Sequence, residues 1–207
     1  MRTVITARDV PQSGELRVAI GSIVTPSARE LARERGVPIR EVPPEEISGL
    51  APPEKTVAIG SDHGGFEMKQ ALLPVFAELG LTVRDVGVYE AKPADYPDVA
   101  LAVAELVADG VAARGIMVDG AGIGSAMAAN KVPGVRAALC YDVASARNSR
   151  EHNDANVLTL GGRLLTLSQA EVVLRVWLST AFAGGRHAAR VDKITGIERR
   201  FLRRPTE

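Results

Sequence analysis

The sequence predicts an α/β fold, in which a five-stranded parallel sheet is covered by helices on both faces. From residue 55 onward, short apolar runs alternate with longer stretches whose apolar residues recur at helical spacing. The apolar runs cover residues 55–60, 81–87, 113–119, 135–140 and 156–161. Strands separated by helices are joined by right-handed crossovers, which make the strands parallel and place helices on both faces.

The intervening stretches predict the helices. The first, residues 65–79, places Met68, Leu72, Val75, Phe76 and Leu79 on one face. Further helices are expected around residues 99–107, from the glycine-rich turn to about 130, and over 143–151, 168–182 and 186–204. The apolar fraction of 46% is enough for a full core, and the aromatic fraction of only 4% suits closely packed layers.

Residues 1–42 form a separate N-terminal extension in this interpretation. They predict a short strand and then a helix, with Thr25 as its cap, Pro26 at its first position and Gly36 at its end. Residues 43–54 hold four prolines and three glutamates and are expected to be a linker. The extension is short for a core of its own, so we expect it to dock elsewhere or stay loosely attached to the domain of residues 55–207.

Charge and cysteine content limit the classes of partner. The formal net charge is zero, which argues against nucleic acid or a membrane surface as the main partner. The single cysteine, Cys140, excludes an intramolecular disulfide and favours a reducing compartment. The first residues do not have the pattern of a secretory signal, and no apolar run is long enough to span a bilayer. We therefore expect a cytoplasmic protein.

Two of the predicted strand ends carry polar residues suited to chemistry. Asp62 and His63 follow the first strand, and Asp119 begins a glycine-rich turn after the third. Ligands of open parallel sheets bind at the carboxyl ends of the strands, and glycine lets backbone N–H groups approach an anion closely. A tight turn without a ligand is an equally good interpretation of the glycines alone. The turn matches neither a P-loop nor a dinucleotide fingerprint, and Asp119 puts a negative charge where an anion is expected.

A second polar group lies at the other end of the predicted sheet. His152 and Asn153 come just before the fifth strand, so they should not meet Asp62 or Asp119 within one chain. They are either structural or part of a neighbouring subunit's site. Arg186 and Arg190 are four residues apart on a predicted helix, where they suit a phosphate dianion or form an ordinary solvated face.

Five motifs together resemble one family. They are SDHGGFEMK, DYP, a GxGxG turn before AANKVPGVRAAL, SREHNDANVLTLGGR and GGRHAARV. In this order, over about residues 57–200, the chain resembles the ribose-5-phosphate isomerase type B family, which includes the galactose-6-phosphate isomerase subunits.

The resemblance implies a Rossmann-like three-layer α/β/α subunit with a C-terminal helix, and a homodimer or dimer of dimers with active sites between subunits. It implies isomerisation of an aldose phosphate to a ketose phosphate through a cis-enediolate, without metal or cofactor. By this pattern His152 assists ring opening and Tyr96 lines the sugar. Hydroxyls and the enediolate would be bound by Asp62, Asn153 and the amides of Gly120, Gly122 and Gly124. The phosphate would be held by His63, Arg163, Arg186 and Arg190.

The chain departs from the family pattern at three positions. Asp119 stands where many members have a cysteine base, Ser125 where others use a glutamate, and Ala121 where the family has a hydroxyl residue that helps open the ring. In one hypothesis Asp119 is the base, and an open-chain or short sugar phosphate is easier to handle than a closed ring. In the other, the chain is a partner-dependent or non-catalytic subunit that binds sugar phosphate.

The N-terminal extension resembles short segments attached to enzymes and accessory proteins of bacterial microcompartments. A helix on a Pro-rich linker is how a cargo segment that docks on a shell or core protein would be built. An ordinary extension packed on the dimer surface is an equally good interpretation. A nucleic-acid arm is disfavoured, because the arginines of the helix are offset by Glu30 and Glu34.

Overall fold

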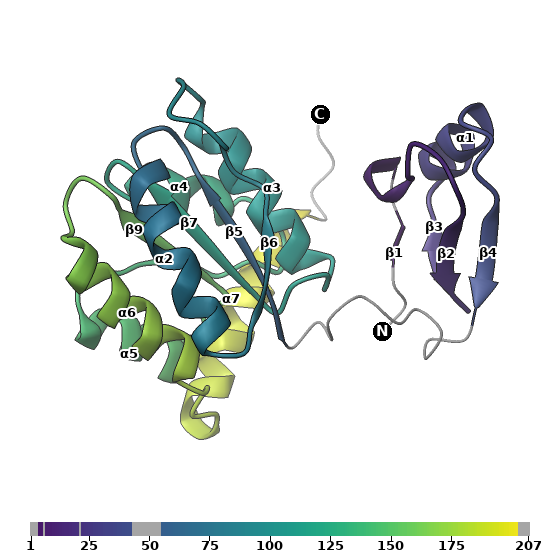
Figure 1. Cartoon of the computed structure of the whole chain (residues 1–207). Coiled ribbons are helices and arrows are strands. Elements are labelled where there is room, and N and C mark those ends of the chain that lie inside the picture. The colour runs from purple at the N-terminus through teal and green to yellow at the C-terminus, as the bar shows by residue number, and fades with distance from the viewer. Residues whose placement is uncertain (1–3, 6, 21, 43–54, 203–207) are drawn as a thin grey trace. The chain divides into compact units, whose positions relative to one another are not determined.

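A computed structural model describes residues 4–5, 7–20, 22–42 and 55–202, and the predicted linker lies outside these ranges. The chain divides into two compact units, residues 1–52 and 53–207 (Figure 1). Each unit is described by itself below.

The larger unit contains the predicted parallel sheet. Its strands are β5 (Thr56–Ser61), β6 (Thr82–Asp85), β7 (Arg114–Asp119), β8 (Ala137–Leu139) and β9 (Val157–Gly161). They are parallel and ordered β6-β5-β7-β9-β8. Asp119 at the end of β7 lies opposite Gly161 at the end of β9, so the loops that follow these strands emerge side by side. The predicted fold class is confirmed.

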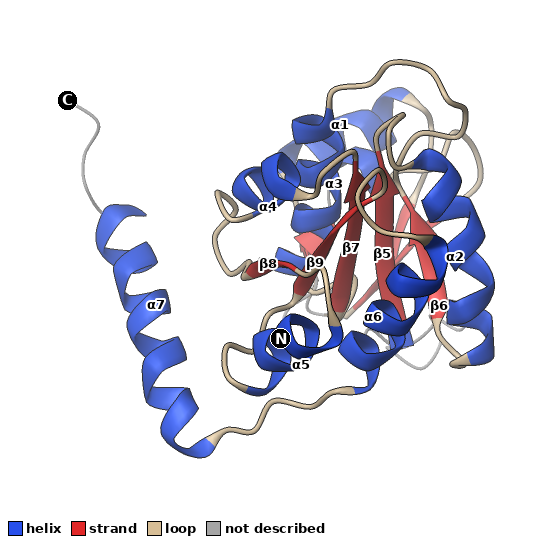
Figure 2. Ribbon diagram, turned by 90° about the vertical axis from the view of Figure 1, so that its left-hand side faces the viewer, coloured by secondary structure: helices blue, strands red, loops and turns tan. Residues whose placement is uncertain are grey.

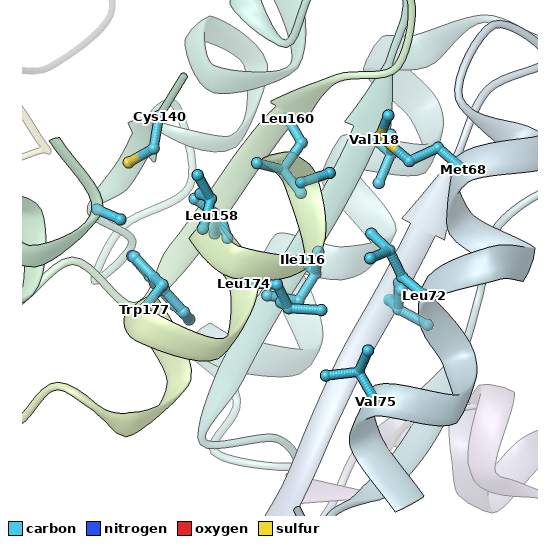
Figure 3. Packing of buried hydrophobic residues seen from close by; sticks show 14 of the residues in the cluster. Met68, Leu72, Val75, Ile116, Val118, Cys140, Leu158, Leu160, Leu174 and Trp177 are labelled. Atoms are coloured by element: carbon cyan, nitrogen blue, oxygen red, sulfur yellow. The ribbon is translucent and has the colours of Figure 1, made fainter. Parts of the chain in front are cut away.

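Helices cover both faces of the sheet, as Figure 2 shows. They are α2 (Phe66–Glu78), α3 (Tyr96–Ala108), α4 (Ile123–Ala129), α5 (Val143–Glu151) and α6 (Leu167–Ser179). One apolar cluster joins the sheet to α2, α5 and α6, and a second joins it to α3 and α4. The first cluster includes the fully buried Trp177 of α6 beside Leu158 and Leu174 (Figure 3).

The last helix, α7 (Ala188–Leu202), lies outside these layers (Figure 2). A 3-10 turn, η4 (Gly185–His187), precedes it. Its cap Gly184 and its first residue Gly185 both have positive φ. Val191 is the buried residue of α7, whereas Ile194, Ile197 and Phe201 are exposed. The predicted spacing therefore exists, but most of the apolar face is uncovered within a single chain.

The N-terminal unit has a core of its own, contrary to the expectation that it is too short for one. Its elements are β1 (Val4–Ile5), η1 (Ala7–Asp9), β2 (Leu16–Ala19), β3 (Ile23–Val24), α1 (Pro26–Glu34) and β4 (Ile39–Val42). Its strands form two parallel pairs, β1 with β3 and β2 with β4. Seven apolar residues bury one another: Val10, Leu16, Val18, Val24, Ala28, Ala32 and Val37. Thr25 caps α1 as predicted.

Candidate active site

The loops after β5, β7 and β9 interlock at the carboxyl edge of the sheet. The N–H of Gly162 donates to the carbonyl oxygen of Asp119 at 2.7 Å, and the N–H of Arg163 donates to that of Gly120 at 3.0 Å. A Cβ at Gly65 would lie 2.1 Å from the carbonyl oxygen of Val118. Gly65 and Gly162 have no side chain to keep the backbones apart, so three loops that are distant in sequence come together at one edge.

Asp62 braces the first of these loops. Its side chain is buried, and Oδ1 accepts hydrogen bonds from the N–H groups of Gly64 at 2.8 Å and Gly65 at 2.9 Å. The neighbouring His63 is exposed, and its Nδ1 accepts from the N–H of Ala94 at 3.5 Å. The adjacent side chains therefore have different environments, one tied into the loop and one at the surface.

Asp119 fills the glycine-rich turn with its own carboxylate. Oδ1 accepts from the N–H of Ala121 at 2.7 Å and from the N–H of Gly122. Oδ2 accepts from the N–H of Ser125 at 3.1 Å and from the Ser125 hydroxyl. The side chain is only 4% exposed. Gly122 has φ +79°, and a Cβ there would lie 2.5 Å from Leu139 Cδ1, so this turn requires glycine.

The turn is thus the anion-binding element that the glycines predict, but the anion that it binds is internal. Four donors converge on one carboxylate at the start of α4, where the helix dipole also favours negative charge. The Gly122 amide, which the sequence interpretation assigned to the enediolate, is one of these donors. Gly120 and Gly124 donate no hydrogen bond to Asp119.

Three longer side chains surround the turn. Tyr96, at the first position of α3, lies against Gly124, where a Cβ would be 2.5 Å from the ring. Arg163 is exposed, and its Cδ would lie 3.6 Å from a Cβ added at Gly120. Tyr141, just after β8, donates its hydroxyl hydrogen to the carbonyl oxygen of Ala121 at 2.7 Å. One edge therefore gathers two carboxylates, two tyrosines and an arginine around backbone amides.

The second predicted group lies at the amino end of β9, away from this edge. His152 caps the C-terminal end of α5, and its ring stacks on that of His187 with 4.1 Å between centroids and 5° between planes. Nδ1 of His152 is 2.8 Å from Nδ2 of Asn148. The sequence-based expectation that His152 and Asn153 do not reach Asp62 or Asp119 within one chain agrees with this topology.

An ionic cluster holds the loop that carries His152 and Asn153. Asp154 has φ +45° and accepts from Arg150 at 2.8 Å and from Arg136 at 3.2 Å. Nε of Arg136 also donates to the carbonyl oxygen of Asn153 at 3.2 Å. Burial and the nearby charge of Arg150 lower the pKa of Arg114 in this cluster to about 10. These bonds fix an unusual backbone conformation beside two candidate site residues.

His187, the last residue of η4, is buried. Burial, the neighbouring His152 and then the charges of Arg186 and Arg190 lower the pKa of His187, and Glu151 opposes this effect. Nε2 accepts from Nε of Arg186 at 3.4 Å, whereas Nδ1 has no hydrogen-bond partner among residues 55–202 and the other described residues. The ring is therefore held by stacking more than by polar contacts.

Arg186 and Arg190 do not share one α-helix as predicted. Arg186 belongs to the 3-10 turn η4 and Arg190 to the first turn of α7, because the positive φ angles of Gly184 and Gly185 delay the start of the helix. Both arginines are exposed.

Sequence reasoning missed Tyr141, Asn148 and His187. Asn148 precedes His152 by four residues on a predicted helix, a spacing that places both on one face and could have indicated the pair. No comparable signal identifies Tyr141, whose contact depends on the order of β8 and β9 in the sheet.

Within the described ranges, no three His, Cys, Asp or Glu side chains gather as they would around a metal ion. The same residues include no helix that could cross a bilayer.

Comparison with known proteins identifies relatives along the larger unit. The model of a family described as Ribose/Galactose Isomerase matches residues 57–194. Ribose-5-phosphate isomerase B of Escherichia coli is 42% identical over 146 residues, which are 70% of this chain and 98% of that protein. A D-erythrulose-4-phosphate isomerase of Pectobacterium atrosepticum is 39% identical, over 67% of this chain and 92% of that one.

The structural comparison agrees with the sequence comparison. The structure of Clostridium thermocellum ribose-5-phosphate isomerase B is 47% identical to this chain and superposes with a TM-score of 0.69, covering 70% of this chain and 99% of that one. The fold is thus that of a sugar-phosphate isomerase, and the protein is an enzyme of that class. The chain belongs to the ribose/galactose isomerase family.

Proposed function

We propose that the enzyme interconverts an aldose phosphate and a ketose phosphate through a cis-enediolate, with Asp119 as the base. The observation that carries this proposal is the carboxyl edge of the sheet, where Asp119, Asp62 and the glycine-turn amides come together beside Tyr96 and Arg163. Isomerisation requires a base for the proton next to the carbonyl and hydrogen-bond donors for the enediolate oxygens.

The contacts of Asp119 suggest how it would act. Three of its four donors are backbone amides, and the fourth is the Ser125 hydroxyl. A hydroxyl can rotate about its side-chain bond, whereas the amides are fixed by the turn. We propose that the Ser125 hydroxyl turns away from Oδ2 when substrate binds and leaves a lone pair for the substrate proton. Gly120 and Gly124 then offer their amides to the enediolate, since the Gly122 amide is engaged.

We propose that each active site is completed by a second copy of the chain, in a homodimer or dimer of dimers. His152 and Asn153 would come from one subunit and Asp119 from the other, because the two groups lie at opposite ends of the sheet. The exposed apolar residues of α7, Ile194, Ile197 and Phe201, favour this proposal, because a partner would cover them.

The phosphate would lie between basic side chains of both subunits. His63 and Arg163 stand exposed at the carboxyl edge, and Arg186 and Arg190 are exposed at the start of α7. Arginines far from the reacting carbons supply binding energy and orientation.

We propose ribose 5-phosphate as the first candidate substrate, because of the family to which the chain belongs. The residue at position 121 also makes shorter sugar phosphates good candidates. Ala121 provides no hydroxyl for ring opening. A tetrose 4-phosphate carries its phosphate on the hydroxyl that would close a five-membered ring, so it stays open. A relative of this chain that is named D-erythrulose-4-phosphate isomerase supports the inclusion of a tetrose phosphate.

Exchange of the substrate proton with heavy water tests the proposal. Parent protein, Asp119→Asn and Asp119→Cys would be incubated with ribose 5-phosphate, erythrose 4-phosphate and a hexose 6-phosphate, and deuterium at the carbon next to the carbonyl would be measured by NMR. We expect exchange by the parent, its loss in Asp119→Asn and partial retention in Asp119→Cys. Equal exchange by Asp119→Asn would place the base elsewhere. No exchange by the parent would favour a partner-dependent or non-catalytic subunit.

We further propose that the N-terminal unit is a docking module for a bacterial microcompartment shell or core protein. It has a separate apolar core and lies outside the range that the family model matches. Co-elution of the full chain with purified shell proteins, compared with a chain lacking residues 1–54, would test this role. Identical elution of the two chains would show that the extension does not dock on these shell proteins.

A further inference from the structure

We propose that Asn148 is a positioning residue that holds His152 in the neutral form with its proton on Nε2. In this form His152 offers the sugar a hydrogen-bond donor. The inference deepens the proposed function, on which the role of His152 rests.

The first step concerns the Asn148 side chain. Nδ2 of Asn153 lies 3.3 Å from Oδ1 of Asn148 and 3.4 Å from the carbonyl oxygen of the same residue. An amide nitrogen can only donate, so Oδ1 of Asn148 is the acceptor on this side. The amide group of Asn148 is thereby oriented with Nδ2 toward His152.

The second step concerns the imidazole. Nδ2 of Asn148 lies 2.8 Å from Nδ1 of His152. Because Nδ2 carries only hydrogens, Nδ1 must accept, and a neutral imidazole that accepts at Nδ1 carries its proton on Nε2. Binding of a second proton at Nδ1 would break this hydrogen bond and place two N–H groups against each other.

The third step concerns what else His152 touches. One face of its ring is covered by His187 at 4.1 Å, and Nδ1 is occupied by Asn148. Arg186, Arg190 and Glu151 are the charged side chains that act on the stacked His187. The Nε2 edge is the polar position that these contacts leave for a ligand.

These contacts give the two ring nitrogens of His152 different roles. A neutral imidazole with its proton on Nε2 cannot act as a base at that atom, but it can donate a hydrogen bond to the ring oxygen or carbonyl oxygen of a sugar. Fixing the tautomer through a partner on the other ring nitrogen is how enzymes set the role of a histidine. Asn148 fixes the tautomer through an uncharged amide group that donates to Nδ1, so the proton of His152 stays on Nε2.

The tautomer can be measured directly, because the full chain has three histidines. Two-bond nitrogen–hydrogen NMR correlations of the imidazoles distinguish a proton on Nε2 from one on Nδ1. Parent, Asn148→Asp, Asn148→Leu and the control Arg147→Gln would be compared, with His152 assigned by His152→Gln. Arg147 is an exposed residue of the same helix, and among residues 55–202 its ionic contact is with Glu151.

We expect Nε2–H on His152 in the parent and the control, and a shift of the proton to Nδ1 in Asn148→Asp, whose carboxylate accepts. Turnover of the parent's best substrate should fall roughly 100-fold in Asn148→Asp and less in Asn148→Leu, as when other catalytic imidazoles lose their proper tautomer. The control should stay within about twofold of the parent.

A parent with its proton on Nδ1, or the same tautomer in parent and Asn148→Asp, would overturn the inference. So would full activity in Asn148→Asp with a shifted tautomer. If the parent turns over no sugar phosphate, the proposed function fails, and the NMR result still decides whether Asn148 sets the form of His152.

Discussion

The replacement Asp119→Asn provides a quantitative test of the filled glycine turn. The carboxylate accepts two backbone amides on Oδ1, and one amide and one hydroxyl on Oδ2. An asparagine can keep Ala121 and Gly122 on its oxygen. Its NH₂ group must then face Ser125. The Ser125 hydroxyl can rotate and accept a hydrogen bond from this group, but the Ser125 backbone N–H can only donate and is left without a partner.

The magnitude follows from these contacts. Two hydrogen bonds change from charge-assisted to neutral, at about 1–2 kcal/mol together. One buried N–H loses its partner, at about 1–3 kcal/mol. The expected loss in the free energy of unfolding is therefore about 2–5 kcal/mol, a large fraction of the stability of an ordinary domain.

Asp62→Asn is the matched control. Asp62 receives both of its amide donors on Oδ1, so an asparagine oxygen can keep both, and we expect a loss of about 1–2 kcal/mol. Urea unfolding at one protein concentration would measure both variants through Trp177, the single tryptophan, which is buried in the larger unit. Equal destabilisation by the two variants would refute the internal-anion description of Asp119.

Three further predictions concern other parts of the chain. Because the pKa of His187 is lowered in the folded protein, the unfolded chain binds the additional proton first as pH falls below about 6.5, so the parent should lose stability between about pH 7.5 and pH 5.5. The His187→Phe variant should lose less stability than the parent over this pH range, as measured by urea unfolding. The same pH dependence of stability in both proteins would contradict this. Removal of residues 1–54 should leave the unfolding midpoint of Trp177 and the turnover of sugar phosphate unchanged, and unfolding of the remainder would contradict the two-unit description. Gly124→Ala should displace Tyr96 and raise KM for sugar phosphate at least about tenfold; an unchanged KM would remove Tyr96 from the site.

The sheet was accessible to sequence reasoning because each strand is a short apolar run between polar or glycine-rich segments. Runs such as residues 113–119 match β7 within a residue, since a buried parallel strand needs apolar residues on both faces. The N-terminal unit was not predicted correctly. Its strands have two to four residues each, and its core depends on small contacts among alanines and valines that no periodicity reveals.

Part of the candidate site was also predictable, because the positions of the strand ends follow from the predicted sheet. Strand order and strand direction place Asp62 and Asp119 at one edge, and this could be read from the alternation of elements. The hydrogen bonds of Asp119 could not, because they depend on the exact path of the turn through Gly122. Likewise the stacking of His152 on His187 requires the chain to return beside α5 after α6, which composition does not encode.

The interlocked glycines of the carboxyl edge have a consequence for mutational scanning. At Gly65 a methyl group would collide with the backbone of β7, and at Gly162 it would lie 2.9 Å from the carbonyl oxygen of Gly64. Library selection would therefore register these positions as intolerant even in a variant with no catalytic base. Because a collision with backbone does not depend on the chemistry of the site, the tolerance profile of this edge would map steric fit and not catalytic function.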